Sequence, residues 1–393
     1  MQSKDIIEVL ESDDAKTFIM NHINEDFTRL SLKFSGKTSF NITVCLQLMT
    51  LYIKAKIKIP LFSEQLLALD KRSFEQSSSQ RIAKFKATVL KGNSLLDITG
   101  GLGVDSIFLS QAFQKIDVIE RNQQLHELAL FNIRKLELNN INRFCGDGSS
   151  YIKPGYDWIY IDPDRRKGSS RSVVLENLEP NILELLPQLK TATNQVYIKL
   201  SPLFDIDEVW RIFDQLNTVY ILAEKGEIKE VGVCLDFRNN ATNKSLVLVD
   251  VASGFNYTSN AQKRVNIEFD SNVENRYLLI PNALLIKSRL SDEYLTGYSV
   301  TKHNSFHYYF SPEKLMIEGV RTFEILGHFS ISAKELVNEL KKLKIEKLNI
   351  VVKGLSDQPE LWHKKLKTLD GGEYYLFILK SKKKESILCK LIS

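Results

Sequence analysis

The sequence predicts an α/β protein in which a mainly parallel sheet follows an N-terminal helical region and precedes smaller α+β modules. Strand-like and helix-like segments alternate between residues 94 and 250, which is typical of a parallel sheet with crossover helices. A glycine-rich turn follows the first strand of this series. Ligands of such sheets bind beyond the carboxyl ends of the strands. Candidate site residues stand at five of those ends, and they are Asp97, Glu120, Asp147, Asp162 and Ser201.

The composition is that of a globular cytoplasmic protein. The chain of 393 residues is long enough for two or three domains, and 43% hydrophobic and 26% charged residues are ordinary values. Because no apolar run approaches a membrane span and residues 1–5 lack a secretory pattern, we expect no membrane contact. The four cysteines form no CxxC pair and the six histidines follow no ligand spacing, so we expect no disulfide framework and no metal.

The expected elements begin with helices over residues 1 to about 90, where apolar side chains such as Phe18, Ile19 and Ile23 keep helical spacing. The alternating region contains strands at 95–98, 116–119, 143–146, 157–161 and 196–200, and helices at about 103–113, 122–138 and 179–190. Residues 230–237 and 244–251 flank a turn-like segment and predict a hairpin.

The C-terminal part is expected to contain short strands and then a compact α+β unit. Polar residues near 252–262 mark a candidate boundary, and short strands follow at 277–280 and 306–310. The last unit is expected to hold strands at 321–326, 348–352 and 374–380 and helices at 332–343 and 358–368. We expect four domains, with the bounds 1–80, 81–255, 256–320 and 321–393.

The glycine turn favours an adenosine-containing ligand. Gly101 and Gly103 lack the Cβ that would keep a ligand from the backbone. Glu120 follows Gly103 by 17 residues at the end of the next strand, where a carboxylate can accept both hydroxyls of a ribose. Because the turn nearly matches the nicotinamide fingerprint, a dehydrogenase is an alternative, and glycine-rich turns also occur without a ligand.

The acidic residues around the turn favour S-adenosylmethionine over a dinucleotide. Asp105 stands in the first helical turn, where it would repel a pyrophosphate and suit a sulfonium or an α-amino group. Asp97 can also hold an ammonium. Asp147, followed by Gly148, can accept a hydrogen bond from the adenine amino group, or it can simply cap a helix.

The catalytic candidates are Asp162, Pro163 and Asp164. Pro163 directs the chain away after the strand, so that Asp162 can accept a hydrogen bond from a substrate amine and Asp164 can act as a base. The basic residues 165–167 can meet a phosphate backbone, and a salt-bridged loop is the alternative explanation of this segment. No cysteine lies near Asp162 or Ser201 in the sequence, which disfavours attack by a thiolate.

The positive charge is concentrated at the C-terminal end. Residues 331–393 hold 14 lysines and 8 acidic residues, a balance of +6 (14 − 8), against +5 for the whole chain. This excess predicts either a nucleic-acid contact or a solvated lysine surface. Its two lysine groups are Lys341, Lys342, Lys344 and Lys347, and Lys382, Lys383 and Lys384.

The segments 97–105, 118–122 and 162–166 together resemble class I S-adenosylmethionine-dependent methyltransferases. With residues 75–78 and 83–86, they resemble more narrowly a bacterial group that carries a THUMP-like C-terminal domain. The resemblance implies a Rossmann-like core at 81–255, a ferredoxin-like segment and a THUMP-like unit. It implies cofactor contacts from Asp97, Thr99, Gly100, Gly101, Gly103, Asp105, Glu120, Arg121, Asp147, Gly148 and Asp162.

The sequence departs from amino-directed nucleic-acid methyltransferases at two positions. Those enzymes have a second proline where Asp164 stands and an aromatic residue where Arg165 stands, so stacking on a flipped base is not assured. THUMP domains elsewhere bind structured RNA, often tRNA. The sequence therefore predicts methyl transfer to a base nitrogen of tRNA or rRNA. The alternatives are methylation of a protein or small molecule, with the C-terminal module as an interaction domain, and an RNA-binding protein with an inactive core.

Overall fold

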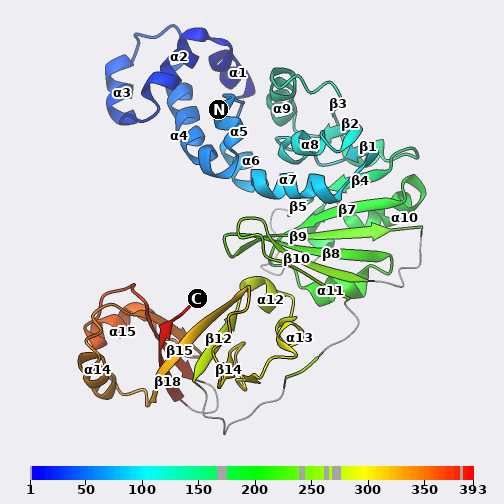
Figure 1. The fold of residues 1–393 in the computed structure, drawn as a ribbon. Coiled ribbons are helices and arrows are strands. Elements are labelled where there is room, and N and C mark those ends of the chain that lie inside the picture. Colours follow the sequence, from blue (N-terminus) through cyan, green and yellow to red (C-terminus); the bar gives the residue numbers. More distant parts are fainter. Residues whose placement is uncertain (1, 166–174, 239–243, 261–264, 268–275, 381–383) are drawn as a thin grey trace. The chain divides into compact units, whose positions relative to one another are not determined.

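The chain divides into two compact units, Met1–Asn260 and Ala261–Ser393. The computed structural model describes residues 2–165, 175–238, 244–260, 265–267, 276–380 and 384–393. Figure 1 shows the elements of each unit in chain order.

The first unit begins with helices, as the sequence predicts. These are α1 (Ser3–Glu11), α2 (Asp13–His22), α3 (Phe27–Phe34), α4 (Ile42–Lys58), α5 (Pro60–Glu64), α6 (Lys71–Gln76) and α7 (Gln80–Val89). Side-chain oxygens cap several of them, and Asp70 and Ser79 accept backbone hydrogen bonds at the starts of α6 and α7. The hydrophobic core of these helices continues into the next part of the chain through Phe108 and Leu128. The helical region is thereby packed against α8 (Val104–Leu109) and α9 (Gln123–Lys135).

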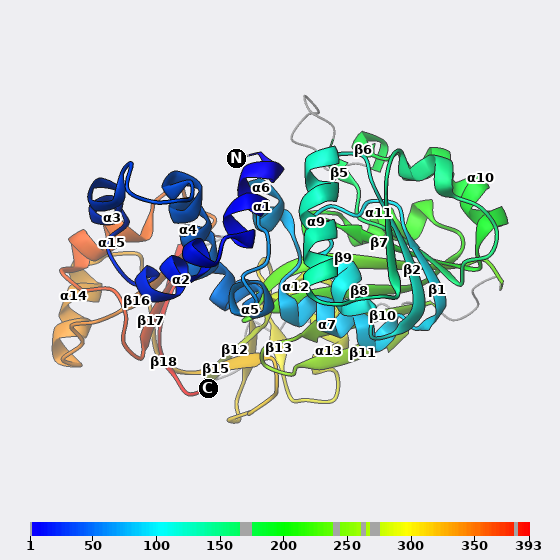
Figure 2. The same cartoon turned by 90° about the horizontal axis from the view of Figure 1, so that it is seen from above.

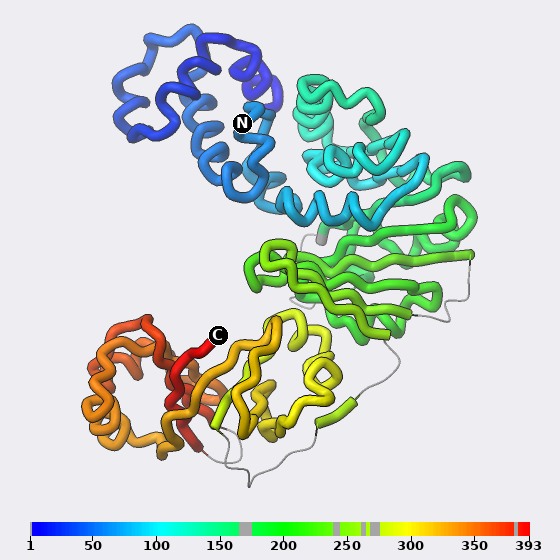
Figure 3. The backbone as a smooth tube through the Cα atoms, viewed as in Figure 1, coloured from blue at the N-terminus to red at the C-terminus, as the bar shows by residue number. Residues whose placement is uncertain are grey.

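A nine-stranded sheet follows α7, and Figure 3 traces the chain from that helix into it. The strands are β1 (Gly92–Asp97), β2 (Phe113–Glu120), β3 (Ile141–Cys145), β4 (Trp158–Ile161), β7 (Gln195–Leu200), β8 (Leu216–Glu224), β9 (Glu227–Asp236), β10 (Ser245–Asp250) and β11 (Asn256–Asn260). Their order is β11-β10-β8-β9-β7-β4-β1-β2-β3. Strands β1 to β4 and β7 are mutually parallel, so their carboxyl ends meet at one edge. Figure 2 shows this part of the chain from above, with helix α9 (Gln123–Lys135) beside the sheet.

Short helices connect the strands of this sheet. They are α8 (Val104–Leu109), α9 (Gln123–Lys135), η1 (Gly148–Tyr151), η2 (Leu175–Asn177), α10 (Ile182–Ala192) and α11 (Ile206–Ile212). Helix α8 begins directly after the glycine turn, and α9 begins after the end of β2. A separate two-stranded ladder pairs β5 (Asp164–Arg165) with β6 (Leu178–Glu179).

The predicted hairpin of residues 230–237 and 244–251 is wrong. Strand β9 forms its hairpin with β8, a strand the sequence analysis did not predict, and β10 then pairs with β8 in parallel. The β8–β9 turn places Lys225 and Gly226 at φ +54° and +78°. Positive φ at both central residues is the geometry of a tight hairpin turn. Asp250 stabilises the turn by accepting hydrogen bonds from both backbone N–H groups.

The second unit contains a seven-stranded sheet in the order β13-β14-β12-β15-β18-β17-β16. Its strands are β12 (Tyr277–Pro281), β13 (Thr301–Lys302), β14 (Tyr309–Ser311), β15 (Val320–Phe329), β16 (Asn349–Lys353), β17 (Tyr374–Lys380) and β18 (Lys384–Leu391). Its helices are α12 (Ala283–Lys287), α13 (Ser291–Leu295), α14 (Ala333–Lys342) and α15 (Pro359–Leu366). Helices α14 and α15 pack on one face through Leu336 and Trp362, and a second core around Phe323 and Phe377 lies on the other face.

The expected domain bounds cut across both sheets. Strand β11 belongs to the first sheet, and β12 pairs with β15 in the second sheet. The four-part division of the chain stays a proposal. Strand β18, which the sequence analysis did not predict, joins β15 to β17 and completes the C-terminal sheet. Among the described residues, no helix is long and apolar enough to cross a membrane.

Candidate cofactor and acceptor site

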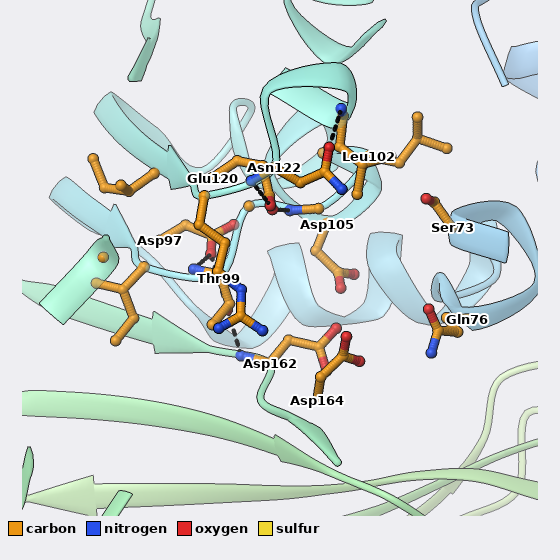
Figure 4. A pocket seen from close by; sticks show the side chains of 18 of the residues that line it. Ser73, Gln76, Asp97, Thr99, Leu102, Asp105, Glu120, Asn122, Asp162 and Asp164 are labelled. Atoms are coloured by element: carbon orange, nitrogen blue, oxygen red, sulfur yellow. Dashed lines mark hydrogen bonds between the residues drawn. The ribbon is translucent and has the colours of Figure 1, made fainter. Parts of the chain in front are cut away.

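A cavity of about 660 Å³ opens at the carboxyl ends of β1, β2 and β4, within the roughly 300–1,000 Å³ typical of ligand pockets. Figure 4 shows it from close by. The structure brings most of the predicted site residues to its wall, namely Asp97, Thr99, Gly100, Gly101, Gly103, Asp105, Glu120, Arg121, Asp147, Gly148, Asp162 and Asp164. Pro163 and Ser201 are not among the described residues that line it.

The glycine turn has the backbone conformation that glycine favours. Gly103 is the N-cap of α8 and has φ +83°, in the left-handed region. At Gly148, a Cβ would lie 2.1 Å from the carbonyl oxygen of Ile98, so the end of β3 can approach the end of β1 only with glycine there. Both glycines therefore shape the cavity wall.

Asp97 is buried and bonded within the protein. One carboxylate oxygen accepts hydrogen bonds from the backbone N–H and the hydroxyl of Thr99, at 3.0 and 3.3 Å. The other accepts from the hydroxyl of Ser106 at 2.6 Å. Burial raises the pKa of Asp97 to about 6, although these hydrogen bonds oppose the shift. Asp97 thus fixes the geometry of the turn.

Glu120 lies at the end of β2 with both oxygens against the turn. One accepts a hydrogen bond from the backbone N–H of Gly101 at 2.6 Å, and the other from that of Asn122 at 2.7 Å. The two bonds hold the carboxylate in one orientation at the cavity wall (Figure 4). Each oxygen keeps lone pairs for further donors, so the predicted contact with a ribose diol fits this geometry.

Asp147 lines the cavity and also caps the short helix η1, where it accepts from the N–H of Ser149 at 3.0 Å. Asp147 therefore does cap a helix, which is one of the two roles that its sequence position suggests. Arg121, the neighbour of Glu120, lies 3.2 Å from Glu179. Both side chains of that ion pair are exposed, so it adds little to stability.

Asp162 is held by contacts that the sequence did not indicate. Its backbone N–H donates to the hydroxyl of Thr99 at 2.6 Å, which joins the end of β4 to the turn after β1. The ammonium of Lys199, on β7, donates to Oδ2 of Asp162, also at 2.6 Å. The side chain of Asp162 stays 37% exposed, so it is accessible from the cavity.

Asp164 follows on the short strand β5. Its nearest basic partner in the described chain is Arg72, at 3.9 Å, and both side chains are more than half exposed. An ion pair this long and exposed leaves the carboxylate available for a substrate. Of the basic segment after Asp164, residues 166 and 167 lie outside the described residues.

Asp105 does not present a free carboxylate, contrary to what the sequence argument for a cationic ligand assumed. Oδ1 lies 2.8 Å from the ammonium of Lys86, and Oδ2 accepts from the hydroxyls of Ser78 and Tyr160 at 3.0 and 2.9 Å. Burial opposes ionisation, but Lys86 and Lys199 outweigh it and lower the pKa of Asp105 to about 2. Its role toward the ligand stays a prediction.

Lys86 is the centre of a buried polar cluster below the cavity. The side chain is fully buried, and its ammonium contacts Glu230 at 3.0 Å as well as Asp105. Tyr197 donates to the other oxygen of Glu230 at 2.6 Å. A buried charge is tolerated only when paired, so these groups depend on one another. In the sequence, Lys86 could have been recognised as a buried lysine because it lies on the apolar face of α7 with Ile82 and Ala83.

Arg143 is a second residue that sequence reasoning missed. It comes from β3 and donates to the carbonyl oxygen of Gly101, below the turn. Burial lowers the pKa of its guanidinium to about 10, while Glu120 and Asp97 oppose that shift. Arg143 therefore supplies positive charge beneath two carboxylates of the site.

The C-terminal lysines are only partly described. Lys341 and Lys342 end α14, and Lys344 and Lys347 follow it; all four are exposed. Lys384 begins β18, and Lys382 and Lys383 lie outside the described residues. Within the described chain, no group of three or more His, Cys, Asp or Glu side chains has the arrangement of a metal site.

Comparisons with known proteins show the fold. A crystal structure of a proposed methyltransferase from Porphyromonas gingivalis is 22% identical, covers 96% of this chain and 98% of that chain, and has a TM-score of 0.80. Residues 320–391 match the family model described as THUMP domain-like. The expected fold class is confirmed: a Rossmann-like α/β core is followed by a C-terminal sheet that contains the THUMP-like match.

One curated relative matches a shorter segment. It is an uncharacterized RNA methyltransferase of Mycoplasma mobile, 29% identical over 100 residues. The match covers 25% of this chain and 25% of that protein, so the chain spans about a quarter of the relative's length.

Proposed function

We propose that this protein is a cytoplasmic S-adenosylmethionine-dependent methyltransferase that acts on a base nitrogen of structured RNA, either tRNA or rRNA. One observation carries the proposal: the glycine turn, Glu120 and the pair Asp162 and Asp164 line the same cavity. A cofactor site and an acceptor site in one cavity are what direct transfer of a group requires.

The described residues fit the cofactor. Glu120 would hold the ribose, Asp147 the adenine amino group, and the backbone of Gly101 and Gly103 the part between them. Asp97 is a further carboxylate on the cavity wall, and its negative charge suits a ligand that carries a sulfonium and an ammonium. The cofactor supplies an electrophilic methyl group there when it is bound.

The acceptor would lie at the end of β4. Asp162 has one oxygen engaged by Lys199, and its other oxygen can accept a hydrogen bond from an amino group. Asp164 is exposed enough to take the proton that the nitrogen must lose. Alignment of the nitrogen within the cavity supplies most of the expected acceleration.

The RNA substrate is supported by three observations outside the cavity. Residues 320–391 match the THUMP-like model, the described part of the lysine group around α14 is exposed, and the curated relative is named an RNA methyltransferase. Methylation of a protein or small molecule is the alternative outcome of the test.

Two measurements test this function. Calorimetry on the full-length protein should show binding of S-adenosylmethionine and no comparable binding of NADH. Mass spectrometry of nucleosides from tRNA and rRNA should then show one methylated base that is absent in a strain lacking the protein. Tight NADH binding alone would support the dehydrogenase alternative, and unchanged nucleosides in the deletion strain would contradict an RNA substrate.

A further inference from the structure

Lys199 presents unused hydrogen-bond donors to the acceptor end of the cavity. It lies on β7, lines the cavity, and is only 12% exposed. Its ammonium has three N–H groups, and the described residues accept from it at one position, Oδ2 of Asp162. The carboxylate of Asp105 lies 3.8 Å away, too far for a hydrogen bond.

Lys199 is a cation in this setting. Burial alone would lower its pKa, but the carboxylates of Asp162, Asp105 and Glu230 outweigh burial and raise the pKa above its ordinary value. An ammonium can donate hydrogen bonds and cannot accept them. The N–H groups of this nearly buried ammonium that find no acceptor among the described residues favour a ligand that offers one.

We propose that Asp162 and Lys199 together recognise an amino group bonded to a carbon next to an unprotonated ring nitrogen. Asp162 accepts from the amino group, and Lys199 donates to the ring nitrogen. This inference rests on the proposed function and names the acceptor of that site. Lys199 is then a specificity-determining residue.

This pairing selects among nucleobases by hydrogen-bond chemistry. Adenine has an amino group beside N1, and cytosine has one beside N3; guanine offers N2 beside N3. Uracil has no exocyclic amino group, and its ring N3–H lies between two carbonyl oxygens, so it cannot offer Asp162 and Lys199 an amino group and a neighbouring unprotonated ring nitrogen together. A site built to hydrogen-bond an amino group of its substrate discriminates against a base that lacks it.

The competing explanation is that Lys199 only neutralises Asp162 and Asp105. That role requires charge and makes no distinction between bases. Base analogues that lack the ring nitrogen separate the two explanations, because they keep the amino group and remove only the acceptor for Lys199.

The experiment measures binding by the full-length protein saturated with S-adenosylhomocysteine. The probes are short oligoadenylate, oligocytidylate and oligouridylate, with 1-deazaadenine and 3-deazacytosine versions of the first two. We expect the amino-bearing oligomers to bind better than oligouridylate, and at least one of them to bind roughly tenfold better than its deaza version. Lys199→Met should abolish that preference, while Lys199→Arg should keep part of it.

Lys229→Met is the matched control, because Lys229 carries the same charge in the same unit, pairs with Glu227 and lies outside the cavity. Thermal unfolding checks that each variant is folded. Equal affinity for normal and deaza oligomers, a preference that survives Lys199→Met, or binding of none of the oligomers would each overturn the inference. If the protein methylates RNA but one of these contrary binding results is obtained, only the inference about Lys199 fails. If the protein methylates no RNA, the proposed function fails as well.

Discussion

Replacing Glu120 by Gln tests the cofactor site most sharply. Glutamine has nearly the same shape, but it puts an amide NH₂ where one carboxylate oxygen stands. In the wild type the two oxygens accept from Gly101 and Asn122 at 2.6 and 2.7 Å, and both are expected to meet the ribose. The substitution removes one acceptor and the negative charge.

The expected effect follows from the strength of a hydrogen bond to a charged group, about 1.5–3 kcal/mol. Loss of one such bond to the ribose should weaken S-adenosylmethionine binding by roughly 10- to 150-fold, since 1.4 kcal/mol is tenfold. Loss of the acceptor for one partly buried backbone N–H should lower the free energy of unfolding by about 1 kcal/mol. Calorimetry measures the first quantity and denaturant unfolding the second.

Glu127→Gln is the control for this prediction. Glu127 is a carboxylate on the neighbouring helix α9, bonded to Ser3 and Gln123, and it lies outside the cavity. It should leave cofactor affinity unchanged. A folded Glu120→Gln protein with wild-type affinity would refute the assignment of Glu120 to the ribose.

Three further predictions concern catalysis, RNA and pH. Asp164→Asn should lower turnover about a hundredfold with the cofactor still bound, and a wild-type rate on the true substrate would exclude Asp164 as a base. RNA affinity should fall steeply with salt concentration. Replacing lysines by glutamine should reduce the slope of log affinity against log salt by about 0.7–0.9 for each phosphate that a lysine no longer neutralises. An unchanged slope would show that those lysines form a solvated surface and do not contact RNA. The lysines to replace together are Lys341, Lys342, Lys344 and Lys347. Because the pKa of Asp97 is raised to about 6 by burial, its protonated form favours folding, so the wild type should lose about 2 kcal/mol of stability between pH 4 and pH 7 relative to Asp97→Asn. Parallel unfolding curves of the two proteins across that range would contradict the shift.

Substitution is preferred to truncation in the RNA test because of the second sheet. Removing residues 321–393 would take nearly all of β15 away from β12, which pairs with it along its whole length. The remaining strand would expose unpaired backbone groups. Loss of RNA binding after such a truncation would therefore not identify the lysines.

The sequence was most informative where one residue type is required by local geometry. Gly103 needs a positive φ, and the apolar runs before Asp97, Glu120 and Asp162 give the strand ends that meet at the cavity. These features depend on neighbours in sequence. They are sufficient to predict the parallel core and most of the residues that line the cavity.

The parts that were missed depend on contacts between distant segments. Lys86 and Glu230 are 144 residues apart, and Lys199 and Asp162 are 37 apart, so no spacing rule joins them. The wrong prediction of a hairpin between residues 230–237 and 244–251 has the same origin. The turn at Gly226 depends on neighbouring residues, but the parallel pairing of β10 with β8 joins segments that are distant in the sequence. The sequence gives no sign that Asp105 is paired, because its partner Lys86 lies on another helix.

Methyl transfer to RNA is the most direct test of the central claim. The full-length protein is incubated with S-adenosylmethionine labelled in its methyl group and with total RNA from a strain that lacks the protein. We predict label in the RNA, removed by ribonuclease treatment and strongly reduced for Glu120→Gln. Absence of label from RNA, or label that ribonuclease leaves in protein or small molecules, would contradict the account.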